Sequence, residues 1–161
     1  MAVQIKIDVE GLEKLQRKKE QMVRDLHGTP MLNAMRKAAL LVVRDAKVYA
    51  PVYHGRLRAS ITPDITTEGK NVVGRVGSKV HYAPYMELGT GTFAGRPRHF
   101  PPPSALKGWA RSKGLNAYVV ARAIGRRGGL RPRRFLQRAM EQNRGQIKTL
   151  LGNGVNLIVR K

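Results

Sequence analysis

The chain has 161 residues, and 42% of them are hydrophobic, which is enough for a single core. It has no cysteine, so disulfides and thiolate metal sites are excluded. Its 31 Lys and Arg against 10 Asp and Glu give a formal net charge of +21, which predicts an acidic partner. That partner is either the phosphate backbone of a nucleic acid or an acidic protein surface.

The hydropathy pattern predicts neither a membrane span nor a secretory signal. No apolar run approaches the length that crosses a bilayer, and the N-terminal residues lack the basic start and apolar block of a signal peptide. We therefore expect a protein without membrane contacts that stays in the cytoplasm where it is made.

The N-terminal half is predicted to contain a strand, two helices and a hairpin. Residues 2–9 alternate apolar and polar side chains, as a half-buried strand does. Residues 11–27 place apolar side chains at helical spacing and predict an amphipathic helix that ends near Gly28. Residues 30–50 predict a second helix, and the extended segments 57–66 and 71–77 predict a β-hairpin.

The second predicted helix is expected to be the most buried one. Thr29 and Pro30 suit its first turn, and Pro51 ends it, because proline cannot continue the hydrogen-bond ladder. Its many alanines would let another element approach closely. One side carries the larger apolar residues and one of these alanines: Met31, Met35, Ala38, Leu41, Val42 and Tyr49.

The C-terminal half begins with a segment rich in glycine and proline. Residues 87–103 have no periodicity, and we expect them to form a long flexible loop. Short helices are predicted at 104–113 and 116–125, followed by a last helix at 132–151 that Gly152, Asn153 and Gly154 terminate. Its apolar stripe comprises Phe135, Leu136, Ala139, Met140, Ile147 and Leu150. Residues 155–159 are predicted to return as a final strand.

No pattern in the chain supports catalysis or a cofactor. The four histidines, His27, His54, His81 and His99, are not spaced as metal ligands, and no two acidic residues form an acid–base pair. The glycine-rich residues 89–95 lack the Lys-Ser/Thr pair of a nucleotide loop, so we interpret them as a hinge or flap. We expect no cofactor, no metal and no enzymatic activity.

A cluster of arginines near the C-terminal helix is the clearest candidate for a binding surface. It comprises Arg122, Arg126, Arg127, Arg131, Arg133, Arg134 and Arg138, on either side of a Gly-Gly pair. Arginine binds phosphates and carboxylates through two parallel hydrogen bonds, which favours a recognition surface over a merely solvated face. The tyrosines do not alternate with these arginines as a base-stacking platform requires, so sequence-specific reading of nucleic acid is not expected.

Three segments together resemble the phage tail components similar to the gene-ten product of bacteriophage HK97, also described as tail-completion or head–tail joining proteins. Residues 46–61, AKVYAPVYHGRLRASI, resemble the family's helix ending in AK and APV followed by GxLRxSI. Residues 80–90, VHYAPYMELGT, are similar to its YAxYxExGT. Residues 131–139, RPRRFLQRA, are similar to its RPFL opening of the C-terminal helix.

The first of these segments also has a physical reading. Gly55 permits a tight exit from the turn, and in a strand Leu57 and Ile61 would point to one side while Arg56, Arg58 and Ser60 point to the other. Two departures from the family pattern leave local contacts open: His54 before the turn glycine, and the extra arginines Arg133 and Arg134.

The resemblance implies an α+β fold, in which a small antiparallel β-sheet packs against a long helix and further helices, in a single domain over residues 1–161. It implies a structural virion protein of a long-tailed phage or prophage, arranged as a ring of six copies at the head–tail junction (the neck). The implied partners are further copies of the chain, a head-closure or connector protein, and a tail terminator or tail tube protein. Non-specific contact with DNA in the channel is a further implied interaction. Candidate residues for an assembly contact are Tyr82, Tyr85, Glu87, Gly89, Phe93, Arg96 and Phe100.

Two other functions remain open at this stage. A basic nucleic-acid-binding module would explain the charge, and a small nuclease or toxin would require an acid–base constellation that the sequence does not contain. The arginine cluster would face either DNA in the channel or an acidic neighbouring ring. We favour the protein neighbour, because a channel through which DNA slides should not grip it.

Overall fold

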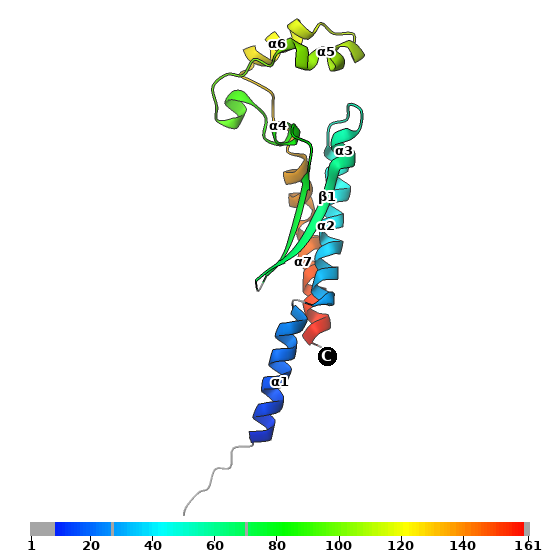
Figure 1. The fold of residues 1–161 in the computed structure, drawn as a ribbon, viewed down its shortest axis with the longest axis vertical. Helices are drawn as coiled ribbons and strands as arrows, with labels where there is room; N and C mark the ends of the chain where they lie inside the picture. The colour runs from blue at the N-terminus through cyan, green and yellow to red at the C-terminus, as the bar shows by residue number, and fades with distance from the viewer. Residues whose placement is uncertain (1–8, 27, 70, 160–161) are drawn as a thin grey trace, which may run out of the picture. The chain divides into compact units, whose positions relative to one another are not determined.

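The computed structural model describes residues 9–26, 28–69 and 71–159 of the chain (Figure 1). The strand predicted at residues 2–9 therefore lies outside the described residues, except for Val9, which begins a helix. The described residues form helices and one two-stranded hairpin sheet, so the expected α+β class is confirmed.

The described chain divides into two compact units. The first unit takes its residues from 1–38, 65–74 and 145–161, and the second unit consists of 39–64 and 75–144. The expectation of a single domain stays a prediction.

Helices α1 (Val9–Leu26) and α2 (Thr29–Tyr49) confirm the two predicted N-terminal helices. All side chains from Glu13 to Gln21 are exposed, and Leu15 keeps 69% of its surface in solvent. Two ion pairs one turn apart, Glu13–Arg17 and Glu20–Arg24, support this outer face of α1. The apolar stripe of α1 is thus only partly covered within the subunit.

Helix α2 supplies much of the core. Its buried residues include Ala34, Ala38, Val42 and Ala46, which recur every four residues along one ridge. The larger residues predicted for this side, Met31, Met35, Leu41 and Tyr49, are only half-buried. The buried face of α2 is therefore built mainly of Ala and Val side chains.

In the first unit, these small side chains allow the backbone of other elements to come close to α2. A Cβ atom at Gly154 would lie 2.8 Å from the Ala34 Cβ, and one at Gly74 would lie 2.7 Å from the Met35 sulfur. The close approach that the alanine-rich sequence predicts is therefore present.

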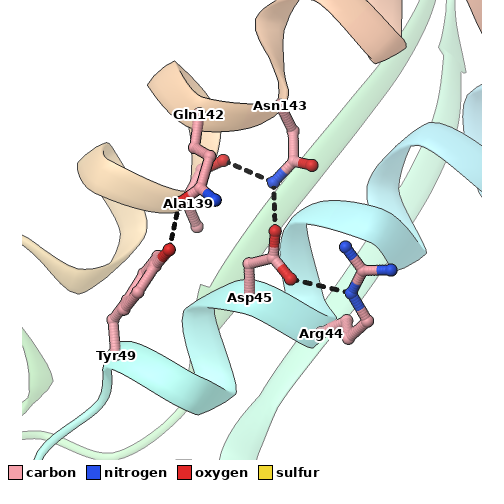
Figure 2. A network of polar contacts seen from close by, with 6 residues as sticks. All are labelled: Arg44, Asp45, Tyr49, Ala139, Gln142 and Asn143. Atoms are coloured by element: carbon pink, nitrogen blue, oxygen red, sulfur yellow. Dashed lines mark hydrogen bonds and ion pairs between the residues drawn. The ribbon is translucent and has the colours of Figure 1, made fainter.

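In the second unit, α2 packs against the beginning of α7 (Phe135–Val159). Phe135 and Ala139 are fully buried and Asn143 is 3% exposed, again at a spacing of four residues. The Asn143 amide donates to Asp45 at 2.7 Å and to the Ala139 carbonyl at 2.8 Å, and the Tyr49 hydroxyl donates to Gln142 (Figure 2). These bonds fix the register of the two helices.

The hairpin is shorter at its start than the sequence predicts. Residues 57–60 belong to helix α3 (Arg56–Ser60), and the strands are β1 (Ile61–Glu68) and β2 (Asn71–Ser78). Leu57 and Ile61 are both buried, but their spacing of four residues suits one helical turn as well as a strand. The Ser60 hydroxyl accepts or donates a bond to Ser78 at 2.7 Å and thereby ties α3 to the end of β2.

The predicted end of the chain is wrong. Helix α7 begins at Phe135 and continues through Gly152 and Gly154 to Val159, so there is no final strand over 155–159. The side chains turned inward are Ile147, Leu150, Leu151, Val155 and Ile158, which follow helical spacing. The glycines do not end the helix because one of them, Gly154, is buried against α2.

Between the hairpin and α7 lie four short elements of the second unit: α4 (Ala83–Leu88), the 3₁₀ turn η1 (Gly91–Ala94), α5 (Pro103–Ser112) and α6 (Ala117–Arg126). The predicted helices at 104–113 and 116–125 are confirmed as α5 and α6. They pack on each other and lie side by side in Figure 1. Part of the predicted loop at 87–103 is regular, because it includes the end of α4 and all of η1.

Candidate assembly surface

Two glycine-rich segments of the second unit, residues 89–92 and 128–130, form a close contact between their backbones. The Thr90 amide donates to the Leu130 carbonyl at 2.9 Å, and the Thr92 amide donates to the Gly128 carbonyl at 3.0 Å. The Leu130 amide donates to the Thr90 hydroxyl at 2.9 Å. Residues 89–92 are therefore held against residues 128–130 by hydrogen bonds, which the interpretation as a hinge or flap did not anticipate.

The contact leaves no room for a side chain at its four glycines, Gly89, Gly91, Gly128 and Gly129. We call it the glycine junction. A Cβ atom at Gly91 would stand 1.9 Å from the Gly128 carbonyl oxygen, and one at Gly129 would stand 2.1 Å from the Thr90 carbonyl oxygen. All four glycines have positive φ angles, which L residues rarely adopt. The glycines are thus required by the contact between the two backbones.

Glu87 joins the end of α4 to the start of α7. Its carboxylate oxygens accept the amide protons of Leu136 and Gln137, both at 2.9 Å. The first amides of a helix have no partner inside the helix, and a negative charge there also complements the helix dipole. Two backbone bonds, from Arg133 to the Met86 carbonyl at 2.8 Å and from Arg134 to the Glu87 carbonyl at 3.1 Å, complete the joint.

The structure assigns different environments to the seven candidate assembly residues. Gly89 is buried, Tyr82 and Glu87 are half-buried, and Arg96 is exposed. Tyr85 is 51% exposed, Phe93 38% and Phe100 59%. Glu87 and Gly89 thus serve their own subunit, whereas Tyr85, Phe93, Arg96 and Phe100 are accessible to a neighbour.

Phe100 is fixed in position although it is exposed. A Cβ atom at Gly125 would stand 1.9 Å from the edge of the Phe100 ring, so the ring lies directly on the backbone of α6. The chain between η1 and α5 is held there, and the His99 amide donates to the Gly128 carbonyl at 3.3 Å. The outer face of Phe100 is therefore presented on a supported segment.

All seven candidate arginines, at 122, 126, 127, 131, 133, 134 and 138, are exposed. In the described part of the chain none of them is within ion-pair distance of a carboxylate. The Arg131 guanidinium lies 5.9 Å from the centre of the Phe93 ring, and that of Arg138 lies 4.5 Å from the Tyr49 ring. The Arg131–Phe93 contact brings one candidate assembly residue beside one candidate basic residue.

The basic surface is larger than the seven arginines alone. The sequence from Leu88 to Met140 contains no Asp or Glu but twelve Lys and Arg. The net charge of the whole chain does not show that the acidic residues are confined to the other parts of the sequence. The longest segment without acidic residues was the signal that could have revealed it. Because opposite charges are missing locally, the field over α5, α6 and the following loop is strongly positive.

Sequence reasoning also missed the outer face of α6. Tyr118 is 76% exposed and Val119 67%, and Leu115 just before the helix is 49% exposed. The same helix exposes Arg122 and Arg126, while Ala121 and Gly125 form a buried strip beside them. The unusually small residues at 121 and 125 were the available signal that the inner face lies there.

A polar network beside Tyr49 supports the helices rather than forming a site. Arg44 donates to Asp45 at 2.7 Å, and Asn143 donates to the other oxygen of the same carboxylate (Figure 2). The bond from Arg44, and then the bond from Asn143, lower the pKa of Asp45 from its ordinary value. Among the described residues no group of three or more histidine or acidic side chains could hold a metal ion.

Residues 13–89 match one protein family, described as "Bacteriophage HK97-gp10, putative tail-component". The expected family is confirmed over this segment. The match indicates a structural role as a phage tail component, which agrees with the expectation that the chain is not an enzyme. No curated protein and no solved structure matches the chain. No helix of the described residues is long and apolar enough to span a membrane.

The HK97-gp10-like segment covers just under half of the chain. It runs from α1 to the first glycine of the glycine junction and includes the resembling residues 46–61 and 80–89. The resemblance of residues 131–139 lies outside the match and stays a prediction. The basic, acid-free part of the chain, with α5 and α6, therefore follows the matched segment.

Proposed function

We propose that this chain forms a ring of six copies at the head–tail junction of a long-tailed phage or prophage and there completes the tail and joins it to the head connector. The observation that carries the proposal is the match of residues 13–89 to a family of phage tail components. The neighbours in such a position are a head-closure or connector protein on one side and a tail terminator or tail tube protein on the other.

Exposed apolar side chains near α4 and η1 support self-assembly. Tyr85, Leu88, Phe93 and Phe100 are each between 38% and 63% exposed, and aromatic residues are typical of contacts between subunits. A ring needs a head-to-tail contact, in which this surface meets a different surface of the next copy. We assign the contact to Tyr85, Phe93 and Phe100 with Arg96, and we assign Glu87 and Gly89 to holding that surface in place.

The size of the purified protein tests the ring. Light scattering followed by negative-stain imaging should find a closed ring for the wild-type chain. Tyr85→Ser and Phe93→Ser should reduce the fraction assembled at a given concentration at least about tenfold, because aromatic anchors dominate such contacts. Val48→Ser is the matched control, since Val48 is 67% exposed on α2 and lies outside the proposed contact.

Rings that form equally well with both aromatic variants would show that the contact lies elsewhere. A wild-type protein that stays monomeric at high concentration and is absent from virions would contradict the proposed function itself.

The alternative function is a basic nucleic-acid-binding module, which the exposed arginines and the acid-free segment from Leu88 to Met140 favour. Salt dependence decides between the two, because each phosphate contact releases a counterion and steepens the loss of affinity with salt. A monomer that binds duplex DNA tightly at physiological salt would establish the alternative. Weak binding to DNA together with salt-sensitive assembly into particles agrees with the structural role.

A further inference from the structure

The outward face of α6 combines apolar and basic side chains in one stripe. Tyr118, Val119, Arg122 and Arg126 follow an i, i+1, i+4, i+8 spacing, so they lie on one side of the helix; Leu115 precedes the helix, and all five are exposed. We call these five residues the α6 patch.

Contacts along α6 and at both of its ends hold the α6 patch in place. α6 packs on α5, and its buried Gly125 supports the Phe100 ring. At its start the Asn116 side chain accepts the Tyr118 amide at 2.9 Å, and after its end Gly128 and Gly129 are locked in the glycine junction. A surface fixed at both ends loses little conformational freedom when a partner binds, which favours recognition.

The chemistry of the α6 patch suits a protein partner better than DNA. Arg122 and Arg126 can each bind a carboxylate or a phosphate through two hydrogen bonds. Leu115 and Val119, however, gain free energy only when another apolar surface covers them, and a phosphate backbone has none to offer. Tyrosine and arginine are enriched among the residues that dominate the binding energy of protein interfaces.

A second copy of the chain is a poor source of the required carboxylates. Glu13 and Glu20 are ion-paired with arginines of α1, and Asp45 is bonded to Arg44 and Asn143. Glu87 holds the start of α7, and Glu141 accepts a bond from Gln137 at 2.8 Å. Asp64 is exposed and could pair with the α6 patch without breaking one of these bonds, but most of the described carboxylates are engaged and a copy would bring its own net charge of +21.

We infer that the α6 patch docks an acidic surface of a different virion protein, one that carries an apolar side chain flanked by Asp or Glu. This inference rests on the proposed function, since such a neighbour exists only where the chain is part of the virion. The ring contact near α4 and η1 and the α6 patch then have separate tasks: the first joins copies of the chain, and the second joins the ring to the next component.

The test uses heads and tails of the same phage produced without this protein, to which purified protein is added. Two double variants change the patch: Tyr118→Ser with Val119→Ser, and Arg122→Glu with Arg126→Glu. Their controls are Val48→Ser and Arg56→Glu with Arg58→Glu, which change exposed residues of the same kinds elsewhere. Ring size is measured by light scattering, and joining is measured as infectious particles formed.

Both patch variants should form rings of wild-type size yet restore joining about tenfold or more less efficiently than the wild type, whereas both controls should match the wild type. Normal joining by the patch variants would overturn the inference. A loss of ring size in the patch variants would identify a second copy as the occupant, and a loss of duplex DNA binding with normal joining would identify DNA. If wild-type protein itself fails to restore joining, the proposed function fails, independently of what the patch variants do.

Discussion

Gly91→Ala measures how strongly the glycine junction holds the second unit together. Gly91 has φ +62°, and its new Cβ would stand 1.9 Å from the Gly128 carbonyl oxygen. The left-handed conformation costs an L residue about 1–2 kcal/mol. Moving the carbonyl would also break the bonds from the Thr92 and His99 amides, each contributing about 0.5–1.5 kcal/mol. Gly91→Ala should therefore lower the free energy of unfolding by about 2–5 kcal/mol in total.

Gly95→Ala separates the two effects. Gly95 has a similar φ of +67°, but a Cβ there would meet nothing within 4 Å, so only the backbone cost of about 1–2 kcal/mol applies. Urea denaturation gives the free energy of unfolding of both variants, and hydrogen exchange reports the Thr92 and His99 amides directly. Equal destabilisation by the two substitutions, with unchanged exchange at these amides, would refute the junction as a source of stability.

Four further substitutions test the surroundings of single residues. Gly152→Ala, in the interior of α7 with open space around it, should raise stability by about 0.5–1 kcal/mol, whereas Gly154→Ala should not, because its Cβ would stand 2.8 Å from the Ala34 Cβ. Glu87→Ala removes both acceptors at the start of α7 and should cost about 0.5–2 kcal/mol in thermal denaturation. Asp45→Asn should lower the free energy of unfolding at neutral pH. The pKa of Asp45 is lowered in the folded protein, so its charged form stabilises the fold above the ordinary pKa of 3.8. The difference in free energy of unfolding between the variant and the wild type should therefore shrink as the pH falls below that value.

Each of these has a readout that would contradict it. Equal stabilisation by Gly152→Ala and Gly154→Ala would mean that α2 and α7 can move apart at Gly154 at little cost in free energy. Glu87→Gln keeps one acceptor, so it should fall between the wild type and Glu87→Ala, and a larger loss than the alanine would contradict the capping role. If the free energies of unfolding of Asp45→Asn and the wild type differ by the same amount at pH 6 and in acid, the charge of Asp45 is not the cause of the difference.

Elements with a local residue pattern could be predicted from the sequence. The helical spacing of apolar residues and a proline after the end of α2 predict helices that the structure confirms. The α+β class and the family over residues 13–89 were also readable, because short motifs such as those at 46–61 depend on residues close together in the chain. Local signals suffice there because the hydrogen bonds of a helix join residues four apart.

The roles of the glycines and of the exposed apolar residues, in contrast, depend on contacts between distant parts of the chain. Gly154 would end an isolated helix by propensity, yet α7 continues because the missing side chain allows close packing on α2. Gly91 and Gly128 meet across a long stretch of sequence, so nothing near either residue predicts the junction. Which side of α6 faces solvent likewise depends on where α5 packs. These outcomes follow from contacts between distant residues, and a one-dimensional pattern does not contain the distances between them.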